Sequence, residues 1–207
     1  MIYITDTKPL CSDKLFQGLY LKTNDHFKEK IDKKKLREDK NRTLAGAFLL
    51  KAGMEKLCLK TDVKIYSSDK GKPYIDGLFF NISHSGDRAV CAFGTSEIGV
   101  DIEKIKPLSD RLMQKIALPS ERAKISAAKQ IVRLWTRKEA LAKCVGTGLG
   151  DEIFKTDLSE DIVRLNGVTY RLKSFELDEY MLSVCSEFDF PPEKIEKVTI
   201  RLSVMEN

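Results

Sequence analysis

The chain has 207 residues, of which 42% are hydrophobic and 32% charged, and its formal net charge is +5. This composition is ordinary for a globular protein, the length suffices for one large domain or two small ones, and no apolar run reaches membrane-spanning length. The N-terminal residues lack the pattern of a signal peptide. The five cysteines are scattered without a C-x-x-C pair, so we expect neither a zinc site nor a disulfide framework, and a reduced, cytoplasmic setting. The positive charge favours anionic partners without selecting one.

The first half of the chain predicts a strand, a long helix and a hairpin. Residues 1–6 are typical of a short strand, and apolar side chains recur at helical spacing from Arg42 to about Leu59. Residues 62–66 form a candidate strand. The segments 78–84 and 89–93 then predict two strands of a hairpin, joined by a polar turn.

Two lysine-bearing segments flank the predicted helix. The run Lys33–Lys35 is expected to lie on a solvated helix face. The segment 67–73 has the residues of a turn, in which Gly71 allows an unusual backbone angle and Pro73 keeps the preceding residue extended. We therefore expect Lys72 to be held on a stiff loop, where it is better placed to bind a ligand than an ordinary solvated lysine.

The hairpin carries small polar residues at the end of its first strand. Ser83, His84, Ser85 and Gly86 follow one another there. Small hydroxyls and a glycine at a strand end suit the close approach of a phosphate. A polar turn that caps its own backbone explains the same residues equally well.

The segment 98–104 alternates between apolar and other residues, which predicts a strand with one apolar face. Asp101 and Glu103 then leave the opposite face side by side. Two neighbouring carboxylates repel one another unless a positive charge lies between them, and a hard cation such as Mg²⁺ fits that position. A solvated strand face with two acids is the alternative.

Residues 131–144 predict an amphipathic helix that ends at a glycine-rich segment, 146–150. Trp135, Glu139 and Lys143 follow one another at four-residue spacing, and so form a stripe along one side of this helix. A surface ion pair between Glu139 and Lys143 is the simplest explanation of that stripe. The remainder is expected to be β-structure, with strands at 162–165, 168–175, 180–185 and 197–204.

The two halves of the chain repeat the same order of a strand, a long helix and a hairpin. We therefore expect an α+β fold of two similar α/β halves, residues 1–96 and 97–207, related by pseudo-two-fold symmetry. Each half would be a small, mostly antiparallel sheet packed on a long helix. The active site would lie between the halves, so that one chain, a monomer, suffices.

Four motifs occur in an order that resembles one known family, the surfactin-synthetase-type 4′-phosphopantetheinyl transferases. The resemblance covers the chain from about Tyr3 to Val204. The motifs are Gly71-Lys72-Pro73, Phe80-Asn81-Ile82-Ser83-His84-Ser85-Gly86, Ile98-Gly99-Val100-Asp101-Ile102-Glu103-Lys104 and Trp135-Thr136-Arg137-Lys138-Glu139-Ala140-Leu141-Ala142-Lys143, with Arg42-Thr43-Leu44 upstream.

The resemblance implies an enzyme that transfers the 4′-phosphopantetheine arm of coenzyme A to a serine of an acyl or peptidyl carrier protein and releases adenosine 3′,5′-bisphosphate. It implies Mg²⁺ as the ion, with Mn²⁺ as the alternative, and coenzyme A as co-substrate. The first half would be the coenzyme A-binding side, and the second half the metal-binding and catalytic side. The implied metal ligands are Asp101, Glu103 and Glu139, and the implied catalytic residues are Glu139 and Lys143. The implied coenzyme A-binding residues are Arg42, Lys72, Ser83, His84, Lys143 and either Lys30 or Lys28.

The segment 104–131 carries seven basic and two acidic side chains, interleaved with apolar ones. Because the implied carrier proteins are small and acidic, we expect this segment to dock them. The predicted docking residues are Arg111, Met113, Lys115, Ile116 and Arg122. Neither nucleic acid nor membrane is an expected partner. A metal-dependent phosphodiesterase or nuclease, and a non-catalytic basic binding module, remain the alternative functions.

Overall fold

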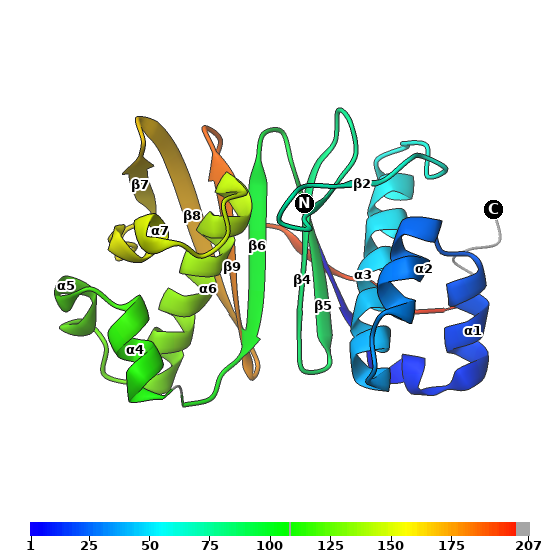
Figure 1. The fold of residues 1–207 in the computed structure, drawn as a ribbon, viewed down its shortest axis with the longest axis horizontal. Helices are drawn as coiled ribbons and strands as arrows, with labels where there is room; N and C mark the ends of the chain where they lie inside the picture. The colour runs from blue at the N-terminus through cyan, green and yellow to red at the C-terminus, as the bar shows by residue number, and fades with distance from the viewer. Residues whose placement is uncertain (108, 202–207) are drawn as a thin grey trace.

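The computed structural model describes residues 1–107 and 109–201. Figure 1 shows four layers, in which two sheets lie between two sets of helices. The first sheet has the order β10-β1-β5-β4, and its strands are β1 (Ile2–Asp6), β4 (Phe79–Ser85), β5 (Arg88–Gly94) and β10 (Ile195–Lys197). The second sheet has the order β6-β9-β8-β7, and its strands are β6 (Ile98–Lys104), β7 (Ile162–Leu165), β8 (Val168–Leu177) and β9 (Tyr180–Glu187). A separate short pair consists of β2 (Tyr66–Ser67) and β3 (Pro73–Tyr74).

One set of helices covers the outer face of each sheet (Figure 1). The helices on the first sheet are η1 (Lys8–Cys11), α1 (Asp13–Leu21), α2 (Asp25–Asp32) and α3 (Arg37–Lys56). The helices on the second sheet are α4 (Asp110–Ile116), α5 (Pro119–Arg122), α6 (Ala128–Val145) and α7 (Asp151–Lys155). In the part of the chain that the structure describes, none of these helices is long and apolar enough to cross a membrane.

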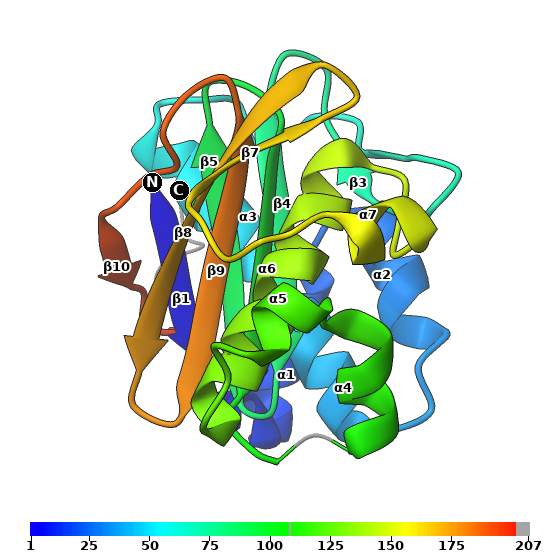
Figure 2. The ribbon, with the colours of Figure 1, turned by 90° about the vertical axis from the view of Figure 1, so that its left-hand side faces the viewer.

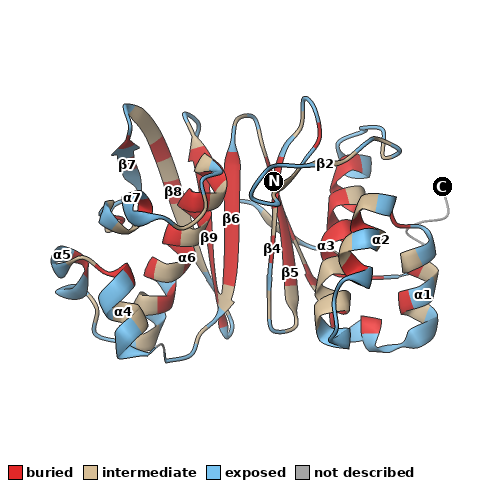
Figure 3. Ribbon diagram, in the orientation of Figure 1, coloured by how far each residue is buried: buried red, intermediate tan, exposed pale blue. Residues whose placement is uncertain are grey.

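Apolar residues alternate with other residues along β6, so the two kinds lie on opposite faces of the strand. Ile98, Val100 and Ile102 are fully buried and pack between the sheets, where Leu182 and Val184 of β9 meet them. Figure 3 shows β6 as a buried strand along almost its whole length. The opposite face of β6 therefore points toward α6, as the sequence pattern predicts.

A glycine allows α6 to lie directly on β6. A Cβ atom on Gly99 would come within 2.0 Å of the Ala140 carbonyl oxygen and 2.5 Å of the Cys144 amide nitrogen. Only a residue without a side chain permits this approach. The close packing brings the end of α6 that carries Lys143 over the face of β6 that carries Asp101.

The mixed α/β fold class is confirmed. The two sheets share their connectivity, because β1 pairs with β5 and β5 with β4, as β6 pairs with β9 and β9 with β8. This correspondence agrees with a duplicated unit, although the two-fold relation and the division between residues 96 and 97 stay predictions. After the second sheet the chain returns to the first, where β10 pairs in parallel with β1 (Figure 2).

Several element boundaries differ from those predicted. The long helix begins five residues earlier than Arg42, where Glu38 and Asp39 lie in its first turn and favour a helix start. Of the candidate strand at 62–66, only residue 66 is in a strand. Val63 and Ile65 instead pack against the apolar core between the first sheet and its helices. The strand expected at 197–204 is at 195–197 instead, and residues 202–204 lie outside the described part.

Candidate functional site

Asp101 is the buried centre of the site. Its side chain is 6% exposed, and its Oδ1 atom lies 2.6 Å from the Lys143 ammonium and accepts a hydrogen bond of 2.8 Å from the Ser83 hydroxyl. Lys143 also donates to Ser83 Oγ at 3.0 Å and to the Val100 carbonyl oxygen at 3.2 Å. The second carboxylate oxygen, Oδ2, is buried and has no hydrogen-bond partner. A buried carboxylate oxygen without a partner is costly, and so marks a position where a ligand or cation would be stabilised.

The polar residues of β4 join the two sheets edge to edge. Asn81 Oδ1 accepts a hydrogen bond of 2.9 Å from the Val100 amide, and the Ser85 hydroxyl donates one of 2.6 Å to Glu103 Oε2. Together with Ser83, these side chains leave β4 at every second residue and reach β6. Their hydroxyls bond to β6 and do not cap their own turn, and the predicted contact of Ser83 with coenzyme A stays a prediction. These hydroxyls hold the carboxylates of β6 in place.

Glu139 lies on the α6 face that covers β6. Partial burial raises the pKa of its carboxyl, the Lys143 cation opposes this, and the charges of Asp101 and Glu103 raise the pKa further. The three carboxylates are therefore close enough to repel one another. Glu139 and Lys143 of α6 therefore lie near Asp101 and Glu103 of β6.

A hard divalent cation needs several oxygen donors around one position. Within residues 1–107 and 109–201, no group of three or more histidine, cysteine, aspartate or glutamate side chains is arranged to hold a metal ion. Lys143 neutralises Asp101 in this arrangement. The chemistry of the donors nevertheless fits a hard cation, because all are carboxylate oxygens and one of them, Asp101 Oδ2, is buried without a partner.

Cations gather on the opposite side of the site. The His84 residue is exposed at the surface, yet neighbouring groups partly desolvate its ring, and this lowers its pKa. The positive charges of Arg42, Lys143 and Lys34 lower it further. Several cations around one neutral imidazole make a favourable site for an anion.

Arg42 and Lys30 bind backbone carbonyl groups at opposite ends of this cationic side. Arg42 donates to the Gly86 carbonyl oxygen at 3.0 Å and forms an ion pair of 2.6 Å with Asp39. Lys30 donates to the Gly71 carbonyl oxygen at 3.1 Å, and desolvation together with nearby lysines lowers its pKa. Both side chains are thus positioned by the backbone they contact.

The predicted stiff loop is present, with Gly71 at a φ of +80° and its amide bonded to the Ser68 carbonyl oxygen at 2.8 Å. The Lys72 ammonium crosses to the second half of the molecule. It lies 3.0 Å from Glu97 Oε2 and donates to the Lys143 carbonyl oxygen at 3.0 Å. Lys72 therefore also links the loop to the end of α6.

Two functional features were missed by the sequence pattern. Lys34 lies in the connection between α2 and α3, not on a helix face, and its charge reaches His84 and Asp39. Asn81 and Ser85 were not expected to bind β6. The every-second-residue spacing of the polar side chains in β4 is the signal that could have indicated the second feature. No local signal indicates the first, because it depends on the path of the chain.

Part of the predicted docking surface is wrong. Ile116 is fully buried, because Leu112 and Ile116 lie on the same face of α4 and pack into the core beneath α6. Met113 remains partly accessible. Arg122 donates to the carbonyl oxygens of Ala117 and Gln114, at 2.9 and 2.7 Å. The exposed charged members of the predicted surface are Arg111, Lys115 and Arg122.

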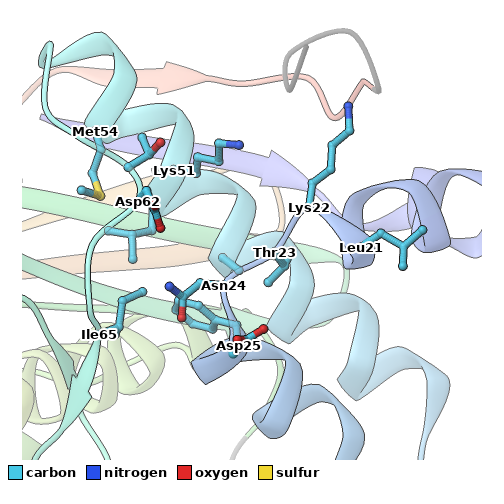
Figure 4. Close-up of a pocket in the computed structure, with 13 residues that line it drawn as sticks. Leu21, Lys22, Thr23, Asn24, Asp25, Lys51, Met54, Asp62 and Ile65 are labelled. Atoms are coloured by element: carbon cyan, nitrogen blue, oxygen red, sulfur yellow. The ribbon is translucent and has the colours of Figure 1, made fainter. Parts of the chain in front are cut away.

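Two cavities have similar sizes. One of about 310 Å³ is lined by Lys72, Glu97 and Cys144, at the junction of the halves. The other, of about 320 Å³, lies beside α3 and is lined by residues such as Asn24 and Met54 (Figure 4). None of the predicted site residues lines the second cavity.

Comparisons with known proteins agree on one family. Residues 97–187 match the family model described as the 4′-phosphopantetheinyl transferase superfamily. The chain is 31% identical over 183 residues to 4′-phosphopantetheinyl transferase Sfp of Bacillus subtilis, covering 79% of this chain and 81% of that protein. It is 34% identical over 175 residues to 4′-phosphopantetheinyl transferase ffp of Bacillus subtilis, covering 75% and 78% of the two chains. It is 30% identical over 188 residues to 4′-phosphopantetheinyl transferase psf-1 of Bacillus pumilus, covering 78% and 77%.

Proposed function

Because the chain belongs to the 4′-phosphopantetheinyl transferase superfamily, we propose roles for its residues in that reaction. The enzyme transfers the 4′-phosphopantetheine arm of coenzyme A to a carrier protein. Family membership decides against the two alternatives, a phosphodiesterase or nuclease and a basic binding module.

The proposed metal ligands are Asp101, Glu103 and Glu139, and the observation that carries this proposal is the buried, unpartnered Oδ2 atom of Asp101. Hard oxygen donors favour Mg²⁺, with Mn²⁺ as the alternative. Such an ion, when bound, neutralises charge on the phosphate under attack and on the leaving group. The hydroxyls of Ser83 and Ser85 orient the two carboxylates of β6 for this task.

Glu139 is the proposed base for the carrier serine, directly or through a water molecule. Its raised pKa makes it a better proton acceptor than an ordinary carboxylate. A serine hydroxyl is a far weaker acid, so the proton moves late in the reaction, as the oxygen begins to bond to phosphorus. Lys143 is proposed to turn from Asp101 toward a phosphate oxygen, since its ammonium lies at the boundary between the acidic and cationic sides.

The proposed coenzyme A-binding residues are Arg42, His84, Lys30 and Lys72, with Lys34 added from the structure. The cations around His84 suit the 3′-phosphate and the diphosphate. Ser83 is assigned to positioning, because its hydroxyl is committed to Asp101 and Lys143. A bound phosphate would raise the pKa of His84 and so strengthen its own contact.

The carrier is proposed to be acidic and to dock on the exposed basic residues Arg111, Lys115 and Arg122 and on the partly accessible Met113. The proposed working form is a monomer, because one chain supplies all proposed site residues. The five free cysteines favour a reducing compartment, and the cytoplasm is the proposed location. Neither nucleic acid nor membrane is required by this proposal.

The function is tested by incubating an apo carrier protein with coenzyme A, Mg²⁺ and the enzyme. Intact-mass spectrometry should show a gain of one phosphopantetheine group. Asp101→Asn and Glu139→Gln should lose this gain, whereas Asp151→Asn, which changes an exposed carboxylate of a surface ion pair, should keep it. Equal activity of Asp101→Asn and Asp151→Asn would contradict the proposed site.

A further inference from the structure

A cavity of about 140 Å³ lies beside α6, and Arg133 and Arg137 are among the helix residues that line it. The other walls come from the end of α5 with the residues that follow it, and from the segment 158–159. Glu139 follows Arg137 by two residues, which corresponds to about 200° around a helix, so the two side chains leave opposite sides of α6. None of the residues proposed for the metal, for catalysis or for coenzyme A lines this cavity. It is therefore separate from the proposed site.

Arg137 brings a buried cation to the cavity. Its side chain is only 2% exposed, and its guanidinium donates 2.8 Å from Nη1 to Asp161 Oδ1 and from Nη2 to the Glu160 carbonyl oxygen. The third donor, Nε, is buried and has no hydrogen-bond partner. A buried donor without an acceptor is costly, so an acceptor that enters the cavity and reaches Nε would be stabilised.

The cations around Arg137 are incompletely neutralised. Arg133 Nη2 lies 3.8 Å from the same Asp161 Oδ1, so two guanidinium groups share one carboxylate. Lys124 also lines the cavity, and its ammonium is 3.7 Å from Glu160 Oε1 in a pair whose side chains are both exposed. Long, exposed ion pairs of this kind contribute little. The cavity therefore has positive charge available for a further anion.

One carboxylate, that of Glu121, is part of the cavity wall, but its charge is already compensated. Its Oε1 atom lies 3.2 Å from the Lys138 ammonium and accepts a hydrogen bond of 2.7 Å from the Leu158 amide. Its Oε2 atom accepts one of 2.8 Å from the Leu118 amide. An anion in the cavity would thus not face an unpaired negative charge.

We infer that this cavity binds a compact oxyanion of the phosphate or sulfate kind. Its volume lies well below the roughly 300–1,000 Å³ that is typical of small-molecule sites, so it suits an ion of a few atoms and not a nucleotide. The ion accepts a hydrogen bond from Arg137 Nε and pairs with Arg133 and Lys124. It thereby joins the segment after α5 to the helix that carries Glu139.

Inorganic phosphate is the probe, titrated into the full chain at constant ionic strength with chloride as the balancing anion. Heteronuclear NMR follows the Nε–H signal of Arg137 and the backbone amides of Lys124 and Ser159, which line the cavity. We expect these signals to shift together and to saturate with one dissociation constant. Phosphate that binds among the proposed coenzyme A-binding residues shifts the signals of His84 instead, so the two sites are measured separately.

Arg133→Gln should weaken this binding about tenfold, which corresponds to the loss of one charge-assisted contact. Lys129→Gln is the matched control, because it removes the same charge from the same helix at an exposed position outside the cavity, and it should leave the affinity unchanged. Lys124→Gln is a second variant with little risk to folding, since its side chain is 63% exposed, and it should act like Arg133→Gln.

A stability measurement gives an independent readout. An ion that binds only the folded protein raises the urea midpoint, and this rise should be larger for the wild type than for Arg133→Gln. Signals that drift linearly with phosphate, equal affinities of Arg133→Gln and Lys129→Gln, or equal rises of the urea midpoint in the wild type and Arg133→Gln would each overturn the inference. The proposed transferase function does not depend on any of these outcomes.

Discussion

The acidic and the cationic sides of the site differ in charge, burial and construction. The side made by β6 and α6 presents carboxylates, of which Asp101 is buried and Glu139 partly buried. The side made by α2, α3 and β4 presents cations around the exposed, neutral ring of His84, and one of these cations, Lys34, lies in a connection. This difference separates two tasks. Exposed cations suit the capture of an anionic substrate, whereas buried carboxylates suit a chemical step that needs fixed geometry and little water.

The helices behind the two sides are held differently. Helix α3 is held by apolar packing, and a Cβ atom on Gly53 would come within 2.3 Å of the Phe93 ring. Helix α6 has buried polar contacts in addition to its apolar packing, such as Thr136 with Ser183 at 2.7 Å and Arg137 with Asp161 at 2.8 Å. Directional contacts fix the rotation of a helix more closely than apolar ones. The helix that carries Glu139 is therefore the one whose register is specified by hydrogen bonds.

The largest expected effect concerns the buried pair of Lys138 and Glu121. The two side chains are 0% and 2% exposed and 3.2 Å apart, and they join α5 to α6. Lys138→Met leaves the Glu121 carboxylate buried without its cation, which should lower the free energy of unfolding by about 3–5 kcal/mol. Urea denaturation measures this loss.

Lys129→Met is the matched control, because Lys129 lies on the same helix in an exposed pair with Glu176. It should change stability by less than about 1 kcal/mol. Adding Glu121→Gln to Lys138→Met should restore part of the loss. Equal effects of the two single variants would show that polar contacts do not hold α6.

The second prediction separates the two sides by kinetics. Asp101→Asn keeps the shape of the side chain but removes its charge, and should lower kcat about 10²–10³-fold, or roughly 2.7–4 kcal/mol. The KM for coenzyme A should change little, because the cationic side is intact. A raised KM with an unchanged kcat would place Asp101 on the binding side instead.

The third prediction concerns the cationic side. Lys72→Ala and His84→Ala should each weaken coenzyme A binding by about 1.5–3 kcal/mol, the usual range for a charge-assisted hydrogen bond. Isothermal titration calorimetry measures the affinity. Dephospho-coenzyme A, which lacks the 3′-phosphate, should respond less to at least one of the two. Equal losses for both ligands would show that neither residue contacts the 3′-phosphate.

Local rules explain why one side could be predicted from the sequence and the other only in part. The alternation around Asp101 and the four-residue spacing of Glu139 and Lys143 each define a face within a single element, and the glycine between the strand's apolar residues allows those faces to meet. The contribution of Lys34 depends on where a connection passes. The burial of Ile116 depends on which face of a short helix meets α6. Neither is encoded by local spacing.

A smaller effect is expected at the basic surface of α4 and α5. Raising salt should increase the KM for the carrier more than the KM for coenzyme A, because exposed charges that guide association are screened. Charge reversal at Arg111 should act in the same direction. Met113→Asp should be worse than any single charge reversal, since it places a charge in the accessible apolar part. If neither salt nor Met113→Asp changes the KM for the carrier, this surface does not dock the carrier.

The smallest effect concerns pH and the proton on His84. Desolvation and nearby cations hold the pKa of His84 below its ordinary value of 6.5 in the free enzyme, so the ring is neutral at neutral pH. A bound phosphate raises that pKa, and binding therefore takes up a proton between the free and bound values. Coenzyme A affinity should rise by a few-fold as pH falls through this window, and stay flat above it.

The 3′-phosphate itself titrates near pH 6 and loses charge in the same range, which opposes the effect. Comparison with His84→Gln removes this complication, because the titration of the 3′-phosphate affects both proteins and only the wild type has the proton uptake by His84. The ratio of wild-type to His84→Gln affinity should increase as pH falls, and a constant ratio would mean that His84 does not contact a phosphate.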